Sequence, residues 1–148
     1  MSRSPVPLTT RFLERAEQRG PDECWPWLGS KTPDGYGQIN RGGKHGAHAL
    51  AHRVAYELAS GTSLPPRSSG LNLDHLCRNR ACVNPGHLEL VTSGENTLRG
   101  ENRAARNARK TACVRGHAFD EKNTYVSNSG QRRCRSCDAD RARRRRLK

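Results

Sequence analysis

The residue types that could do chemistry gather between positions 73 and 96. Asp74 and His75 are adjacent, and Asn96 follows them on the C-terminal side. Carboxylate and amide oxygens are ligands for Mg²⁺, which can relieve charge on a phosphodiester and on its leaving 3′ oxygen. A neutral histidine can take the proton from an attacking water because its pKa lies near working pH. These residues predict metal-assisted phosphodiester hydrolysis.

The C-terminal quarter holds four side chains with the spacing of zinc ligands. Zinc takes four ligands in a tetrahedron, and two close pairs joined by a longer loop satisfy it with little chain strain. The region is too poor in apolar residues to bury four unconnected cysteine and histidine side chains. The spacing therefore predicts a structural zinc site formed by Cys113, His117, Cys134 and Cys137.

A second ligand set is interleaved with the chemical residues. Cys77, Cys82 and His87 supply three ligands, and Cys24 is the cysteine left to complete the four. All six cysteines are then used, in two sets of three cysteines and one histidine. A catalytic zinc with three ligands and an open water position is the alternative for this set. The fit of Cys24 favours a second structural zinc, because thiolate-rich sites are usually closed.

Two short strands and a helix are expected to position these residues. Residues 71–75 and 87–91 alternate apolar and polar side chains, and the connection between them needs pinning. Thr92 and Glu95 form a capping box that opens a helix running to about Lys110.

A strand, strand, helix unit of this kind would bring Asn96 against the end that carries Asp74 and His75. Neighbouring strand residues point to opposite faces, so both face one metal only if the strand ends or twists there. On a continuous helix, five polar side chains would fall within an arc of about 80°. Contact with phosphates is favoured over a merely solvated face for this stripe, which contains Asn96, Arg99, Arg103, Arg106 and Lys110.

The N-terminal half is expected to supply a hairpin and two helices. Residues 24–46 contain turn signals, and their two tryptophans favour core packing over base stacking. Residues 47–60 show an apolar stripe of helical period, and a shorter helix is expected over 10–19. His48 and His52 are four apart, but the glutamate of a His-Glu-x-x-His motif is missing, so a shared metal is disfavoured.

The composition bounds the class of protein. With 148 residues, 32% hydrophobic and 5% aromatic, the chain needs staples beyond its apolar core. Its net charge of +13 points to a polyanionic partner, nucleic acid first and anionic membrane second. Residues 111–148 carry 11 basic and 4 acidic side chains, more than half of that excess. The sequence shows no apolar run long enough to span a bilayer and no signal peptide, so we expect a cytoplasmic protein.

The central segment resembles the HNH endonucleases, also called ββα-metal or His-Me finger nucleases. It is most similar to the zinc-bound His-Cys box homing endonucleases and related phage HNH proteins. The resemblance is tight over about 25 residues, and looser from Cys24 to Cys137. The matching residues are His75-x-Cys77-x4-Cys82-x-Asn84-Pro85-x-His87-Leu88 and Asn96.

The resemblance implies roles for single residues. His75 would be the general base and Asn96 a ligand of a catalytic Mg²⁺. Asp74 matches the acidic first position of HNH proteins, where it would bind the metal, although His-Cys box enzymes need not have an acid there. Arg53, with Arg41 as the second choice, would contact the scissile phosphate.

The expected protein is an α+β metal-dependent DNA endonuclease of a phage or its bacterial host. A small zinc-stapled HNH domain, with an N-terminal hairpin and helix, would occupy residues 1–110, and a zinc-binding module with a basic tail residues 111–148. Arg143 and Arg144 of the tail would bind double-stranded DNA. Homodimerisation should not be assumed, because the second ligand set departs from the His-Cys box order.

Two other functions remain open. A non-catalytic zinc protein that binds DNA would tolerate replacement of His75, but it gives no reason for the placement of Asp74, His75 and Asn96. An RNA-binding zinc protein is permitted by the basic tail. It is disfavoured because readers of single-stranded RNA usually present stacking aromatics, and only seven Phe, Trp and Tyr residues occur here.

Overall fold

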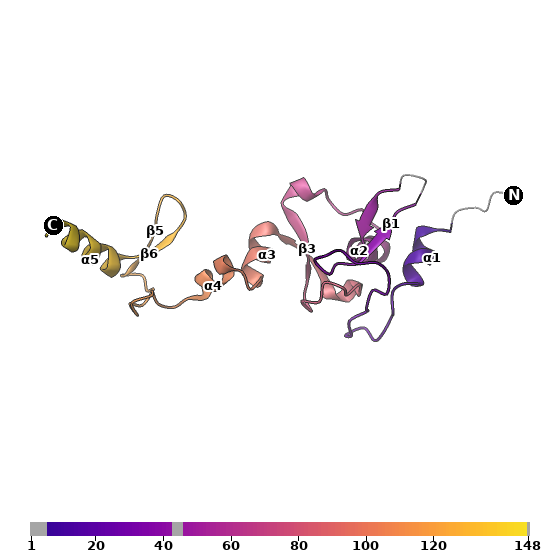
Figure 1. The fold of residues 1–148 in the computed structure, drawn as a ribbon, viewed down its shortest axis with the longest axis horizontal. Helices are drawn as coiled ribbons and strands as arrows, with labels where there is room; N and C mark the ends of the chain where they lie inside the picture. The colour runs from indigo at the N-terminus through magenta and orange to yellow at the C-terminus, as the bar shows by residue number, and fades with distance from the viewer. Residues whose placement is uncertain (1–5, 43–45, 148) are drawn as a thin grey trace. The chain divides into compact units, whose positions relative to one another are not determined.

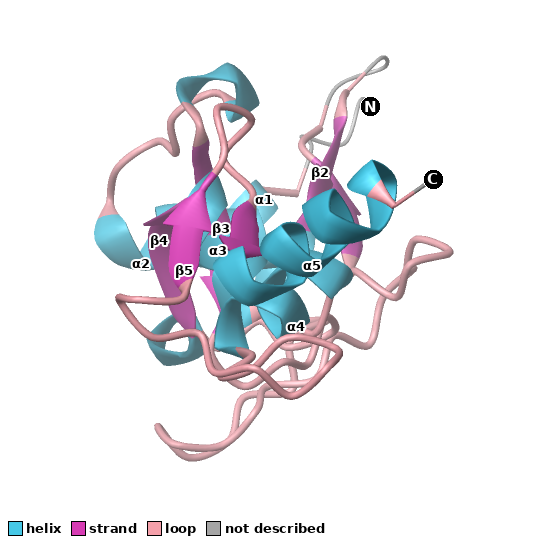
Figure 2. Ribbon diagram, turned by 90° about the vertical axis from the view of Figure 1, so that its left-hand side faces the viewer, coloured by secondary structure: helices cyan, strands magenta, loops and turns pink. Residues whose placement is uncertain are grey.

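The structure is a computed structural model that describes residues 6–42 and 46–147 (Figure 1). The chain divides into two compact units, Met1–Asn96 and Thr97–Lys148. Helices and two-stranded antiparallel sheets occur in both units, so the predicted α+β class is confirmed. Figure 2 colours the helices and strands differently. The assignment of domains to 1–110 and 111–148 stays a prediction. None of the helices described is long and apolar enough to cross a membrane.

The first unit contains two hairpins, of which the second carries the chemical residues. Strand β1 pairs with β2, and β3 pairs with β4 in a register that sets Leu71 opposite Thr92 and His75 opposite Leu88. One 3₁₀ turn, Arg67–Ser69, precedes the second hairpin, and another, Pro85–His87, lies in the connection between its strands. The helices and strands of residues 8–99 are, in chain order, α1 (Leu8–Leu13), β1 (Gln38–Asn40), β2 (His48–Leu50), α2 (Ala51–Ser60), β3 (Leu71–His75), β4 (Leu88–Thr92) and α3 (Ser93–Arg99).

The apolar core of the first unit lies around Trp27. Its ring is 1% exposed, packs 5.5 Å from the Phe12 ring centroid, and donates its indole N–H to the Ser30 carbonyl at 3.0 Å. A Cβ built at Gly37 would lie 2.6 Å from this ring, so glycine is needed there. The expectation that the tryptophans pack in a core is confirmed for Trp27. Buried neighbours include Ile39, Val54, Ala55 and Val83.

Helix α2 begins later than its apolar stripe predicts. Residues 48–50 are a strand, because Ala49 pairs with Ile39 across the first hairpin, and the helix starts at Ala51. It ends at Gly61, which adopts the left-handed conformation at φ 67° as its sequence position predicts. The first helix spans Leu8–Leu13 rather than 10–19. Hairpin pairing, a tertiary contact, overrides helical periodicity at His48.

The helix predicted from residue 93 to Lys110 is wrong as a single element. It is broken after Arg99, and α4 (Arg103–Arg109) starts afresh. Asn102 caps α4 by accepting from the Ala105 N–H at 2.9 Å, while its amide donates to the Thr97 carbonyl at 2.9 Å. Asparagine favours such a cap over a helix interior.

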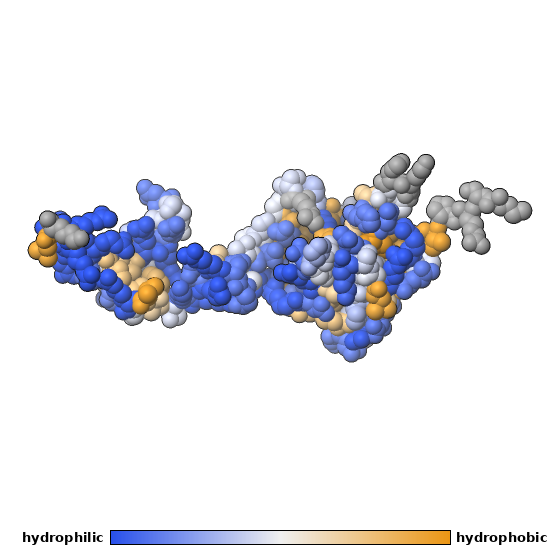
Figure 3. Space-filling model, viewed as in Figure 1, coloured by the Kyte–Doolittle hydropathy of each residue, from blue (hydrophilic) through white to orange (hydrophobic). Residues whose placement is uncertain are grey.

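The second unit has almost no apolar core. Of its described apolar residues only Ala105 and Cys134 are buried, and Val114 is 99% exposed. Its surface is mostly hydrophilic (Figure 3). Strands β5 (Thr124–Val126) and β6 (Arg132–Cys134) pair, and α5 (Arg135–Arg146) follows directly.

Candidate active site and metal centres

Strand β3 ends at His75, where the chain turns sharply. The Leu76 N–H donates to the His87 carbonyl at 2.9 Å, and the Arg78 N–H donates to the His75 carbonyl at 3.0 Å. Arg78 adopts φ 57°, a conformation that non-glycine residues rarely take. The strand therefore ends at His75. This meets the condition under which the neighbouring side chains of Asp74 and His75 can face the same metal.

His75 is buried and hydrogen-bonded to the backbone of the segment between β3 and β4. Its Nε2 lies 3.1 Å from the Cys82 carbonyl oxygen. Since a carbonyl only accepts, this nitrogen carries the proton in the neutral ring, and Nδ1 keeps the lone pair. Burial lowers the pKa of His75, opposed by the Cys82 carbonyl and Asp74. The ring is thereby kept neutral and able to accept a proton.

Two aromatic rings that sequence reasoning did not assign to the site pack against His75. The His52 ring from α2 meets it edge-on with centroids 4.7 Å apart, and the Tyr36 ring lies 6.0 Å away. Arg80 covers Tyr36 at 5.4 Å. Three distant stretches of sequence meet here, and no local pattern marks that meeting. His48 and His52 do not join either metal cluster.

Asp74 is a buried acid with an arginine partner. Its side chain is 7% exposed, and its two oxygens accept from Arg78 Nη1 at 2.8 and 3.1 Å. Asp74 sits opposite Glu89 in the hairpin. The structure thus gives the carboxylate a cation from within the chain.

The other predicted catalytic residues, Asn96 and Arg53, lie on α3 and α2 rather than on β3. Asn96 is half-buried in α3, and among the hydrogen bonds seen for the described residues none links it to Asp74 or His75. Arg53 donates to the Pro65 carbonyl at 3.1 Å. It lines a cavity of about 330 Å³ together with Arg41, whose guanidinium pairs with Glu57.

The first ligand set converges as its spacing predicts. The candidate ligand atoms of Cys24, Cys77, Cys82 and His87 all lie within 4.8 Å of one another. Buried Asn84 ties the two chain segments together, because its amide donates to the carbonyls of Pro21 and Glu23 at 2.8 and 2.7 Å. Burial raises the pKa of the Cys82 thiol to about 12. Three thiols and an imidazole in this arrangement fit a tetrahedral zinc ion.

The second ligand set converges in the same way. Cys113, His117, Cys134 and Cys137 lie within 4.8 Å, with the three sulfurs 3.3 to 3.6 Å from His117 Nδ1. Burial acts to raise the pKa of Cys134, but hydrogen bonds from Cys137 N–H and the Asn123 amide lower it to about 6. A thiolate is the form that binds zinc. Both clusters bring together the four ligands that a tetrahedral zinc ion takes.

The predicted DNA-binding cations do not share one helix. Arg99 belongs to α3, whereas Arg103 and Arg106 are exposed on α4 and Lys110 follows its last turn. The break at residues 100–102 removes the continuous stripe. Arg143 and Arg144 are exposed in the last turns of α5, where Arg143 pairs with Asp140.

Residues 49–98 match a family model described as HNH endonuclease. The match covers both strands of the second hairpin and α2. Protein 2.8 of Escherichia phage T7 is 31% identical over 90 residues, which cover 61% of this chain and 57% of that protein. The chain thus spans little more than half the length of this relative. No solved structure matches it significantly.

Proposed function

We propose that the chain is a metal-dependent endonuclease that hydrolyses DNA phosphodiester bonds, because residues 49–98 match a family model described as HNH endonuclease. The observation that carries the proposal is the buried His75, whose Nε2 is fixed on the Cys82 carbonyl. This bond leaves Nδ1 as the base for water. General base catalysis by a positioned histidine contributes about 10²- to 10⁴-fold to rate.

Asp74 and Asn96 offer the oxygen ligands for the divalent metal that HNH enzymes generally use, which we propose is one Mg²⁺. When bound, the ion would supply charge stabilisation at the scissile phosphate and the leaving 3′ oxygen. Asp74 is paired with Arg78, so metal binding there requires Arg78 to share or release the carboxylate. Asn96 would have to approach Asp74 when metal and DNA are bound.

The first cluster would act as a structural zinc that positions the base. Cys82 offers its sulfur to the cluster and its carbonyl oxygen to His75. Fixing the sulfur therefore fixes the atom that orients the imidazole. The second cluster would hold another structural zinc in the C-terminal unit. Neither role needs an open coordination position.

The partner we propose is double-stranded DNA in the cytoplasm of a bacterial host. Arg53 would contact the scissile phosphate, with Arg41 as the alternative, because both line one cavity beside the hairpin β1–β2. The remaining phosphate contacts would come from Arg99, Arg103, Arg106, Lys110, Arg143 and Arg144. No homodimer is assumed.

The test is conversion of supercoiled plasmid with Mg²⁺, with an EDTA control. Wild type should nick or linearise the plasmid, and His75→Ala should lose about 10²- to 10⁴-fold in rate while remaining folded and zinc-loaded. Asp74→Asn should also lose activity, whereas Asp34→Asn, in an exposed turn, should not.

Three outcomes would change the proposal. Equal activity of wild type and His75→Ala would point to a contaminating nuclease and remove His75 as the base. Tight, salt-sensitive binding without cutting would favour the non-catalytic DNA-binding protein. Activity in EDTA would contradict the divalent metal.

A further inference from the structure

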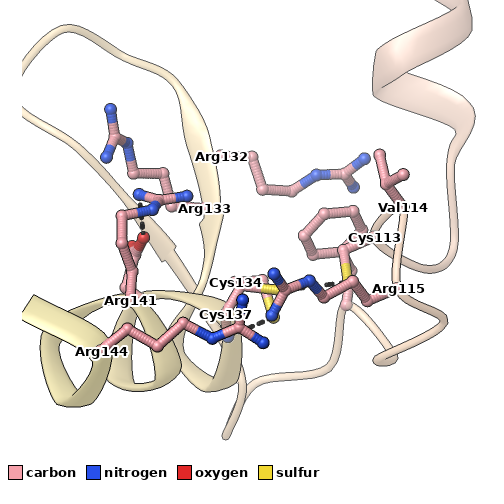
Figure 4. Close-up of a pocket in the computed structure, with 11 residues that line it drawn as sticks. Cys113, Val114, Arg115, Arg132, Arg133, Cys134, Cys137, Arg141 and Arg144 are labelled. Atoms are coloured by element: carbon pink, nitrogen blue, oxygen red, sulfur yellow. Dashed lines mark hydrogen bonds and ion pairs between the residues drawn. The ribbon is translucent and has the colours of Figure 1, made fainter. Parts of the chain in front are cut away.

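The C-terminal unit has a cleft of about 520 Å³ beside its metal cluster, and arginines dominate its walls. They come from the loop after Cys113, from β6 and from α5, so they converge from three parts of the unit. Figure 4 shows their side chains arranged around the cysteines of the cluster. This arginine cleft is lined by Arg115, Arg132, Arg133, Arg141 and Arg144.

Anions within the chain balance only part of this charge. Asp138 accepts from Arg141 at 2.8 Å and from the Tyr125 hydroxyl at 2.6 Å, so both its oxygens are used. Asp140 pairs with Arg115 at 3.6 Å and is shared with Arg143 outside the cleft. A zinc ion with three thiolates and a neutral histidine would add one net negative charge. At least two guanidinium charges of the cleft remain without an anion among the residues that the structure describes.

One arginine of the cleft is held in place before any ligand arrives. Arg132 donates to the carbonyls of Asn107 and Lys110 at 2.6 and 2.9 Å, and its guanidinium lies 4.2 Å from the centre of the Phe119 ring. A guanidinium fixed in this way loses little freedom when it binds a phosphate. The planar fork of arginine also matches phosphate geometry with two parallel hydrogen bonds.

The aromatic residues of this unit argue for a duplex rather than a single strand. Phe119 lies under Arg132, and Tyr125 lies under Arg135 at 5.2 Å. Single-stranded nucleic acids are usually bound by stacking unpaired bases on open aromatic faces. Both rings already have an arginine over one face. The cleft therefore presents charge and hydrogen-bond donors, which suit the sugar-phosphate backbone.

We propose that the arginine cleft binds backbone phosphates of duplex DNA and anchors the nuclease to its substrate through the C-terminal unit. The inference rests on the proposed function in taking DNA as the partner. It adds Arg115, Arg132, Arg133 and Arg141 to the binding surface, and it makes position within the cleft, rather than net charge, the deciding property.

The test compares two double variants that remove the same charge from the full-length chain. Both are made in a His75→Ala background to prevent cutting. Arg133→Gln with Arg144→Gln removes two cleft arginines that have no ion pair among the described residues. Arg145→Gln with Arg146→Gln removes two arginines of α5 that do not line the cleft. Binding to a short fluorescent DNA duplex is measured by anisotropy over a series of salt concentrations.

Each lost phosphate contact should flatten the slope of log Kd against log salt by about 0.9, so the cleft pair should flatten it by about 1.8. The control pair should change the slope by well under 0.9. Equal losses in the two double variants, or no loss in the cleft pair, would overturn the proposal. Preference of the parent chain for single-stranded RNA over the DNA duplex would overturn it as well.

The outcome of this binding test is independent of whether the chain proves to be a nuclease. If the otherwise unaltered chain never cuts plasmid but only the cleft pair loses affinity, the catalytic proposal fails and the cleft stands. If it cuts plasmid and both double variants bind alike, the cleft proposal fails alone. Unchanged zinc content and circular dichroism show that each variant is folded.

Discussion

The two cysteine-histidine clusters have the same composition but different surroundings. Cys82 of the first cluster is fully buried beside Val83, in a unit whose core is built around Trp27. Cys134 of the second cluster has Ala105 as the only other buried apolar residue among those described in its unit. A metal held by the same ligands would therefore clamp an existing core in one unit and replace a core in the other. What a metal contributes depends on how much apolar burial its unit already has.

The largest expected effect is loss of the second cluster. Cys134→Ser should unfold residues 111–146, because structural zinc contributes on the order of 10 kcal/mol to small zinc domains and this unit has no core to substitute for it. Amide NMR spectra should lose the dispersed signals of this unit and keep those of the first. Cys24→Ser is the matched change in the first cluster and should leave the Trp27 signals dispersed. Persistent folding of the second unit in Cys134→Ser would contradict the comparison.

Trp27→Ala tests the apolar core that the second unit lacks. Removing this ring should destabilise the first unit by about 3–5 kcal/mol, as is typical of large core deletions. Thermal unfolding of the first unit reports the change, while protease resistance of residues 111–146 should be unaltered. Leu28→Ala, at a 66% exposed neighbour, is the control and should change stability by no more than about 0.5 kcal/mol. Similar losses in the two variants would show that the core lies elsewhere.

Asn84→Ala removes the hydrogen bonds that join the two chain segments of the first cluster. The substitution leaves the carbonyls of Pro21 and Glu23 without their donor and should cost about 1–3 kcal/mol. A chelator should then remove metal faster from the first cluster than from the second. Asn79→Ala, at an exposed residue of the same loop, provides the control. If both clusters lose metal faster to the same extent, Asn84 does not act on the first cluster alone.

The smallest effect is expected at the start of α3. Thr92 and Glu95 cap each other, with the Glu95 N–H donating to Thr92 Oγ1 at 3.2 Å and the Thr92 N–H to Glu95 Oε2 at 3.1 Å. Thr92→Ala should cost about 1 kcal/mol. Both clusters should keep their metal, since this cap contacts neither. Urea unfolding measures the change, with Thr97→Ala as the control. A loss of zinc in Thr92→Ala would show that the cap and the clusters are coupled.

Local sequence patterns were enough to predict the elements that are determined by residues close together in the chain. The capping box at Thr92, the stop at Gly61 and the alternating strand at 71–75 are set by neighbours in sequence. The pairing of Cys24 with the central ligands also followed, because counting left no other cysteine. Metal coordination is readable from sequence because its ligand types are few.

Features that depend on tertiary contact could not be predicted. The approach of Tyr36 and His52 to His75 joins a turn, a helix and a strand end that no periodicity relates. The break after Arg99 depends on the N-cap that Asn102 provides for α4. The helical spacing of the charged residues gave no sign of this cap. The position of Asn96 relative to Asp74 remains a prediction.

The connection between β3 and β4 has a consequence for how the chain can change in length. Surface loops usually tolerate insertions and deletions. Here His75 pairs with Leu88, and Cys77, Cys82 and His87 lie between them within reach of one metal. An added or deleted residue would move a ligand away from the others unless the strand pairing shifted with it, and a shift by one position turns every side chain of a strand to the other face. Related chains should therefore vary in length elsewhere and hold this stretch constant, although it contains hardly any regular secondary structure.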